Sequence, residues 1–208
     1  GRVRVVLDGP AGPLSVAVLP EVQGDWLDVD DLDAVHSAGA ALATIHRALA
    51  AAHPRSDHRA MEPPDLTARV TGWLARGDRG YAPAATRRLQ RLLTDAPPLD
   101  VPAQLVHHDV RSANILTQGS SVVAMLDFDE VSLSYRVDDL ARASVYLATR
   151  FTRWGPTPRP ARRALRRGYE AADQLSDAEA RWLEILTLWY GLHAITIGAD
   201  RQQWVAAL

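Results

Sequence analysis

The first part of the chain alternates short apolar runs with turn-forming residues. Residues 2–7 and 14–19 are rich in valine and leucine and flank a Gly- and Pro-rich turn over 9–13. This pattern predicts a β-hairpin. Pro20–Gly24 interrupts the pattern, so we expect an irregular connection to the next element.

Helical spacing of apolar residues dominates the rest of the chain. It predicts helices over 32–52, 65–76 and 83–94, a helix that opens at Asp138, and a long helix that ends near residue 198. Asp30 or Asp31 is suited to cap the first of these helices, and Ser176 with Glu179 has the spacing of a capping box for the last. We therefore expect a mainly helical protein.

A second stretch of strand-like sequence interrupts the helices. Asn114–Thr117 and Val122–Phe128 are largely apolar and lie on either side of a Gly-containing turn, which predicts a second hairpin. Because the hairpins and helices form separate blocks along the chain, the expected fold class is α+β.

Composition is that of an ordinary soluble globular protein. The chain has 208 residues, of which 47% are hydrophobic, and a net charge of −2. This near-neutral balance gives no reason to expect nucleic acid or a membrane surface as a partner. The chain has no cysteine, which excludes disulfides and thiolate chemistry. We expect a cytoplasmic protein, and the sequence does not indicate an oligomeric state.

The basic residues are unusual, because all 23 of them are arginine. A P-loop needs a lysine to reach the phosphates, and the N-terminal lobe of a kinase needs a strand lysine for the same purpose. Neither lysine is present in this chain. Since the first residue is Gly1 rather than methionine, we expect an N-terminal truncation and a chain that alone binds nucleotide poorly and is inactive.

The most informative segment is LVHHDVRSANIL, residues 105–116. It contains His107-x-Asp109, followed five residues later by Asn114. A kinase catalytic loop has this spacing, with an Asp that accepts the proton of the substrate hydroxyl and an Asn that holds a metal ion. The motif alone is a weak signal, since three residue types over eight positions recur by chance.

Two further features strengthen the signal. Asp127-Phe128-Asp129 ends the second predicted hairpin, which Asn114 begins, so antiparallel pairing brings an amide oxygen and a carboxylate together. Such hard oxygen ligands suit Mg²⁺ bound jointly with phosphates. The second feature is Asp138-Asp139, which opens the next predicted helix.

The series HHDVRSANIL, LDFDE and DDLAR resembles the aminoglycoside phosphotransferase and choline kinase superfamily, which has a protein-kinase-like fold. The Asp-Phe-Asp form is most similar to the homoserine-kinase-like and stress-response-kinase branch. AGAALATIHRAL (38–49) and the segment 165–186 also resemble helices of this family. The resemblance implies a remnant of the N-lobe sheet and hinge over 1–24 and a helical C-lobe over 25–208, with the catalytic loop and a metal-site hairpin.

The resemblance also implies roles for individual residues. Asp109 is the expected catalytic base, Asn114 and Asp127 the Mg²⁺ ligands, and His107 and Asp139 the residues that brace the catalytic loop. The hinge that meets the adenine of ATP is expected at Pro20, Glu21 and Val22. The implied reaction transfers the γ-phosphoryl group of ATP to a hydroxyl of a small molecule, such as an amino alcohol, a sugar or an aminoglycoside-like compound.

Two positions of the loop depart from the usual pattern. His108 stands where the family usually has Gly, and it either crowds the loop or reaches the substrate. Arg111 stands two residues after Asp109, where protein kinases place a Lys. Its guanidinium is suited to neutralise charge on the transferred phosphoryl group, although a plain surface role is equally open. Asp129 is either an auxiliary ligand or a solvated acid.

Other interpretations stay open. Without a Gly-rich loop and a strand Lys, the protein is alternatively a catalytically inactive kinase-like binding or scaffold protein. A third interpretation is a metal hydrolase that binds zinc through His107, His108 and Asp109. The Arg-rich stretch 159–167 is expected to be a solvated helix face rather than a phosphate or nucleic-acid site, and Trp189 is expected to pack in the core with its neighbour Tyr190.

Overall fold

A short strand-rich beginning and a helical body make up the computed structural model, which describes residues 4–17, 20–52, 62–76, 80–197 and 200–208. The helices are α1 (Leu32–Ala51), α2 (Leu66–Ala75), α3 (Pro83–Thr94), α4 (Arg136–Tyr146), α5 (Arg159–Ala172), α6 (Asp177–Ile197) and α7 (Arg201–Ala206). The strands are β1 (Arg4–Gly9), β2 (Gly12–Ala17), β3 (Asp25–Trp26), β4 (Gln104–Val106), β5 (Ile115–Gln118), β6 (Ser121–Met125) and β7 (Ser132–Ser134). The predicted mainly helical α+β class is confirmed.

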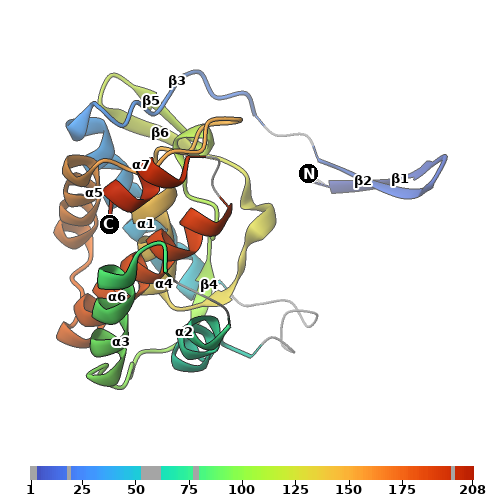
Figure 1. Cartoon of the computed structure of the whole chain (residues 1–208). Helices are drawn as coiled ribbons and strands as arrows, with labels where there is room; N and C mark the ends of the chain where they lie inside the picture. The colour runs from blue at the N-terminus through green and yellow to red at the C-terminus, as the bar shows by residue number, and fades with distance from the viewer. Residues whose placement is uncertain (1–3, 18–19, 53–61, 77–79, 198–199) are drawn as a thin grey trace.

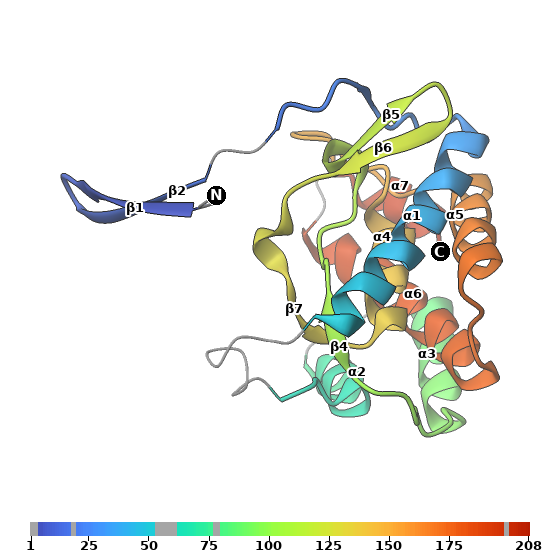
Figure 2. The ribbon, with the colours of Figure 1, turned by 180° about the vertical axis from the view of Figure 1, so that it is seen from behind.

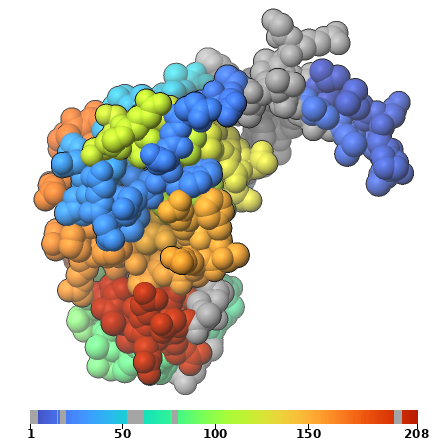
Figure 3. Space-filling model, turned by 90° about the horizontal axis from the view of Figure 1, so that it is seen from above, coloured from blue at the N-terminus to red at the C-terminus, as the bar shows by residue number. Residues whose placement is uncertain are grey.

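The first predicted hairpin forms from β1 and β2, although the outer ends of its predicted strands lie outside the described residues. The strands are antiparallel, with Val6 opposite Ser15 and Gly9 opposite Gly12. The hairpin projects from the helical body, as Figure 1 and the view from above in Figure 3 show. Its large apolar side chains are exposed, with Val6 at 62% and Leu14 at 53%.

The second hairpin, β5–β6, lies in a three-stranded sheet with the order β3-β5-β6. Ile115 pairs with Met125. The second strand ends at Met125 rather than at Phe128 as predicted, because Asp127 adopts a left-handed conformation with φ of 64° and turns the chain. A short 3₁₀ turn, η3 (Phe128–Glu130), follows.

Helices α1 and α5 pack side by side on one flank of the body (Figure 2). Two glycines permit their close approach. A Cβ on Gly39 would lie 2.0 Å from the carbonyl oxygen of Leu165, and a Cβ on Gly168 would lie 1.9 Å from that of His36. Such distances are far inside van der Waals contact, so any larger residue at either position would force the two backbones apart.

Side-chain caps fix two of the predicted helix starts. The Asp31 carboxylate caps α1 by accepting from the amides of Asp33 and Ala34. At the start of α6, the amide of Ser176 donates to Glu179 and the amide of Glu179 donates to the Ser176 hydroxyl, which is the predicted capping box.

Helix α4 begins at Arg136, two residues before its predicted start. The Arg136 guanidinium binds Glu179 at 2.6 Å and Asp173 at 2.8 Å, which anchors this end of α4 to α5 and α6. These contacts accompany the early start, because the hydrogen bonds that Arg136 donates to both carboxylates hold the first residue of α4 in place. Hydrogen bonding to Glu179 raises the pKa of Arg136 far above its usual range.

The core lies between α1, α4, α5 and α6. Its fully buried large side chains come from all of these helices and from α3, and they include Leu42, Leu89, Leu140, Leu165, Ile185 and Leu186. Strands β4 and β7 pair with each other, with Gln104 opposite Ser134, two residues before α4. Among the described residues, no helix has the length and hydropathy to cross a bilayer.

Candidate active site

The loop after β4 is held from one side by the carboxylate of Asp139. Its Oδ2 accepts from the backbone amide of His107 at 3.0 Å and its Oδ1 from that of His108, also at 3.0 Å. His46 Nε2 lies 3.0 Å from Oδ2. Asp139 is fully buried. Burial alone would raise the pKa of this carboxyl, but hydrogen bonding to His46 and the loop amide lowers it below its ordinary value.

His46 is itself oriented by the neighbouring helix. Its Nδ1 lies 2.8 Å from the hydroxyl of Tyr169 on α5, while its Nε2 donates to the carboxylate, which can only accept. Both side chains are buried. This geometry gives His46 a packing and hydrogen-bonding role that links the α1–α5 pair to the loop.

His107 ties the loop to the segment before Asp127. Its Nδ1 accepts from the amide of Asp109 at 3.2 Å, so Nε2 carries the proton and donates to the carbonyl of Leu126 at 2.9 Å. The ring packs on Phe128, with the centroids 4.5 Å apart. Because both ring nitrogens are engaged, His107 does not serve as a zinc ligand. Within the described part of the chain no cluster of three metal-ligating side chains occurs.

Three of the predicted site residues meet directly at the loop. Oδ2 of Asp109 accepts from Arg111 Nε at 3.0 Å and from Asn114 Nδ2 at 2.8 Å. Asn114 also donates to the Asp109 carbonyl at 2.8 Å, so its amide is locked. In the described residues, Oδ1 of Asp109 receives no hydrogen bond. One carboxylate oxygen is therefore held in position while the other remains able to accept a proton.

Asp127 lies next to Asn114 along the hairpin. The amide of Leu126 donates to the Asn114 carbonyl at 2.8 Å, so Asp127 follows the residue that pairs with Asn114. Its side chain is exposed, as is that of Asp129. Asp127 makes no hydrogen bond or ion pair with other described residues. Carboxylate and amide oxygens, the groups that Asp127 and Asn114 carry, are ligand types that suit Mg²⁺.

The predicted hinge segment precedes β3 and is tied to the end of β5. The carbonyl of Gln23 accepts from Gln118 Nε2 at 2.9 Å, and Gln23 Nε2 donates to Glu21 at 2.7 Å. Pro20, Glu21 and Val22 are exposed. Gln118 is the last residue of β5, whereas Asn114 directly precedes the first. The hinge segment therefore lies beside the end of β5 that is farther from Asn114.

A cavity of about 290 Å³ opens beside Asp109, and we call it the Asp109 cavity. The loop contributes His108, Asp109, Val110 and Arg111 to its wall, and the other lining residues are Arg69, Arg142, Tyr146, Thr149, Trp154, Trp189, Tyr190 and His193. The helices α2, α4 and α6 bring most of these together. Trp189 and Tyr190, predicted as core residues, are 7% and 5% exposed and also line the cavity.

A buried ion pair supports the cavity and was missed in the sequence. Arg69 donates from both Nη atoms to the buried Asp138, at 3.0 Å from Nη1. Asp138 also accepts from Ser134 at 2.8 Å and from the Tyr190 hydroxyl at 3.0 Å. Burial would raise the pKa of Asp138, but His108 and Arg69 lower it well below its usual range. Asp138 is the neighbour of a motif residue, but no local pattern marks Arg69.

His108 explains why a glycine is expected at its position. Its φ is 66°, in the left-handed region that costs most residues about 1 kcal/mol or more. Several contacts offset this strain. Its amide donates to Asp139, its Nδ1 lies 2.7 Å from the Ser132 hydroxyl, and its Nε2 lies 3.6 Å from Asp138. The side chain reaches the wall of the Asp109 cavity.

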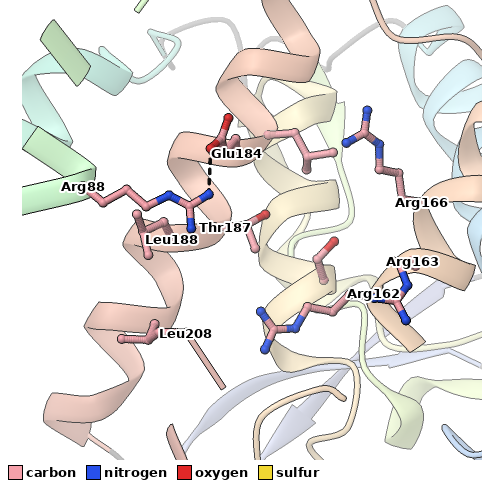
Figure 4. A pocket seen from close by; sticks show the side chains of 10 residues that line it. Arg88, Arg162, Arg163, Arg166, Glu184, Thr187, Leu188 and Leu208 are labelled. Carbon is pink, nitrogen blue, oxygen red and sulfur yellow. Dashed lines mark hydrogen bonds and ion pairs between the residues drawn. The ribbon is translucent and has the colours of Figure 1, made fainter. Parts of the chain in front are cut away.

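A second cavity, of about 280 Å³, lies between α3, α5 and α6 and contains none of the predicted site residues. Figure 4 shows the arginines around it, with Arg88 joined to Glu184 at 2.8 Å. Arg162 donates to the carbonyls of Thr157 and Ala207, and Arg166 pairs with Glu170 on its own helix. Arg162 therefore has a structural role and Arg166 pairs within its own helix, so these contacts involve no ligand.

Comparison with solved structures defines the class of fold. A GDP complex of a variant of aminoglycoside 2'-phosphotransferase-IIIa matches with a TM-score of 0.64 and 17% identity, over 97% of this chain and 69% of that chain. Macrolide 2'-phosphotransferase MphH from Brachybacterium faecium matches with a TM-score of 0.53 and 20% identity, over 98% and 65%. The amicoumacin kinase hAmiN in complex with AMP-PNP, Ca²⁺ and Ami matches with a TM-score of 0.56 and 14% identity, over 99% and 67%. The fold is that of the kinase-like phosphotransferases.

The family model described as the phosphotransferase enzyme family matches residues 2–187. The chain belongs to this family, as the resemblance of its motifs predicted. No curated protein matches the sequence.

Proposed function

We propose that this protein is an ATP-dependent phosphotransferase that acts on a hydroxyl of a small molecule. The observation that carries the proposal is the arrangement of Asp109. One of its carboxylate oxygens is fixed by Arg111 and Asn114, and the other receives no bond from the described residues at the wall of a cavity. A positioned base beside a substrate-sized cavity is what this reaction requires.

In the proposed reaction, Asp109 orients the acceptor hydroxyl and accepts its proton. The acceptor oxygen bonds to the γ-phosphorus while the bond to the leaving ADP breaks. Little covalent chemistry is asked of the protein, so positioning and charge stabilisation supply the acceleration. The hydrogen bonds of His107 and Asp139 support this role because they fix the backbone amides of His107, His108 and Asp109.

Asn114 and Asp127 would hold Mg²⁺, which neutralises the negative charge of the phosphates when bound. Arg111, now paired with Asp109 at 3.0 Å, would donate to the transferred group. Pro20, Glu21 and Val22 would meet the adenine of ATP. We further propose the division into an N-lobe remnant with hinge over 1–24 and a C-lobe over 25–208, no nucleic-acid or membrane partner, and the ATP-containing cytoplasm as location.

A second candidate, an inactive kinase-like binding or scaffold protein, is favoured by one observation. No lysine is present to contact the phosphates. The genomic sequence upstream of Gly1 separates the two candidates, because a Gly-rich hairpin and a strand Lys encoded there would favour the enzyme.

The direct test is the variant Asp109→Asn in the full-length gene product. We expect the transfer of phosphate from MgATP to fall by about 10²- to 10⁴-fold, because the amide cannot accept the proton. Phosphoryl transfer is measured against a screen of amino alcohols, sugars and aminoglycosides. Asp100→Asn, an exposed carboxylate on the connector before β4, is the matched control and should keep wild-type turnover. Equal turnover in both variants would remove Asp109 from the mechanism.

A further inference from the structure

We infer that the Asp109 cavity takes an anionic acceptor, namely a small hydroxyl compound with a flat apolar body and a carboxylate or phosphate group. This inference rests on the proposed function, because it names the substrate class of the same site. It distinguishes this chain from the solved relatives named above, one of which is an aminoglycoside phosphotransferase and another a macrolide phosphotransferase.

The first argument is the charge of the cavity wall. Three arginines line it, and Asp109 is the one carboxylate among the described lining residues. Arg69 is neutralised by Asp138 and Arg111 by Asp109. Arg142 has no ion pair or hydrogen bond in the described part of the chain, and its guanidinium lies 5.8 Å from the ring centroid of Tyr146. A polycation would find no counter-charge here beyond the catalytic group, whereas an anion would pair with Arg142.

The second argument is the set of unsatisfied polar atoms. Within the described residues, five buried side-chain polar atoms have no hydrogen-bond partner, and four of them belong to residues that line this cavity. Arg69 Nε and Trp189 Nε1 are donors only, and the Thr149 hydroxyl is able to donate. Each unpaired buried group costs about 1–3 kcal/mol. The unpaired side-chain atoms of this wall are thus mainly donors, and the wall offers few acceptors to an ammonium-rich ligand.

The third argument is the shape and apolar surface of the cavity. Tyr146, Trp154, Trp189 and Tyr190 contribute aromatic rings to the wall, and Trp154 is 47% exposed. Such rings favour a flat apolar partner. The volume of about 290 Å³ lies at the lower end of the usual range for ligand pockets. A small acceptor with one apolar body and one anionic group therefore fits both the walls and the space.

The test uses three hydroxyl compounds with the same phenyl ring: 3-phenyllactate, its neutral amide 3-phenyllactamide, and the cationic phenylalaninol. Calorimetry without nucleotide gives the Kd of each for the 208-residue chain. We expect phenyllactate to bind at least about tenfold more tightly than the other two. Competition by phenylacetate and by phenyl phosphate then distinguishes whether the site prefers a carboxylate or a phosphate.

Arg142→Gln should remove the preference by raising the Kd of phenyllactate about tenfold, while that of phenyllactamide stays within about twofold. Arg163→Gln is the matched control, since this exposed arginine lies on α5 and lines the second cavity. It should leave all three values unchanged. Equal affinity for acid and amide, tightest binding of phenylalaninol, no binding of phenyllactate, or an equal effect of Arg142→Gln on acid and amide would each overturn the inference.

An activity measurement separates this inference from the proposed function. The full-length gene product is supplied with MgATP and each acceptor. If phenyllactate binds selectively but no acceptor is phosphorylated, the inference stands and the proposed function falls. If phosphate is transferred and phenylalaninol has the highest kcat/KM, the proposed function stands and the inference falls.

Discussion

The polar groups on the two sides of the loop after β4 differ in how far the chain satisfies them. On one side, the buried Asp139 carboxylate accepts hydrogen bonds from the backbone amides of His107 and His108 and from the ring of His46. Both of its oxygens are therefore satisfied by the chain itself. Nothing is left over for a ligand, and the charge acts only on the loop.

On the other side, several polar groups of the residues that line the Asp109 cavity have no hydrogen-bond partner among the described residues. Arg69 Nε, Thr149 Oγ1 and Trp189 Nε1 lack partners among the described residues, and Arg142 carries a charge that no described residue neutralises. On the Asp139 side the chain satisfies its own polar groups, whereas on the cavity side several polar atoms and the charge of Arg142 have no partner among the described residues.

The largest effect expected from this comparison is that of Asp139→Asn. The substitution removes the charge that pairs with His46 and points an amide donor at donors of the loop. We expect the free energy of unfolding to fall by about 3–5 kcal/mol, the usual cost of breaking a buried pair. Urea denaturation measures it, with the exposed Asp100→Asn as a control that should stay within about 0.5 kcal/mol. A loss below about 1 kcal/mol in Asp139→Asn would contradict a rigid brace.

Acid should weaken the same region through Asp138 and Asp139, whose folded-state pKa values are both lowered. Their contribution to stability is fully present above the unfolded pKa, about 3.9. It is lost as the pH falls towards the folded values, because the unfolded state then binds more protons. We therefore expect the unfolding free energy to decline steadily below about pH 5.

The variant Asp138→Asn sharpens this prediction. It should reduce the slope of stability against pH by up to about 1.4 kcal/mol per pH unit, the value for one proton. Arg69→Gln, which removes the ion pair that lowers this pKa, should reduce the slope partly and serves if the first variant does not fold. Asp100→Asn should keep the wild-type slope. An unchanged slope in both test variants would mean that the pair does not control acid stability.

The smallest effect is expected on the cavity side. Thr149→Val replaces a buried hydroxyl that has no partner in the described chain by a methyl group of similar shape. The free energy of unfolding should stay constant or rise by up to about 1 kcal/mol, because a desolvated polar group is removed. Thermal unfolding measures this. Ser134→Ala, which removes a hydroxyl bonded to Asp138 at 2.8 Å, should by contrast destabilise. If Thr149→Val lowered the free energy of unfolding more than Ser134→Ala does, the two sides would not differ in this way.

The sequence predicted the elements whose signals are local. The hairpins, the caps at Asp31 and Ser176, and the main helices follow from spacing and turn residues, and the motif over 107–114 predicted a loop in which Asp109 and Asn114 do meet. The metal and nucleotide roles of the site remain predictions. The early end of the second hairpin escaped notice because a left-handed Asp127 leaves no compositional mark.

The walls of the Asp109 cavity were beyond sequence reasoning for a different reason. Arg69 and Asp138 are 69 residues apart, and Trp154 and Trp189 come from a loop and a distant helix. No periodicity connects such positions, so only the packing of α2, α4 and α6 reveals that they share one cavity. His108 was noticed as an exception to a family pattern, yet its contact with Ser132 needed the pairing of β4 with β7.

The close approach of α1 and α5 at Gly39 and Gly168 affects a hydrogen bond farther along these helices. Tyr169 directly follows Gly168, and its hydroxyl reaches His46 farther along α1, at 2.8 Å. The close spacing of α1 and α5 therefore sets the position of the Tyr169 hydroxyl and, through His46 and Asp139, that of the loop that carries Asp109. A methyl group at either glycine would push the two helices apart and thereby displace this loop from outside the Asp109 cavity.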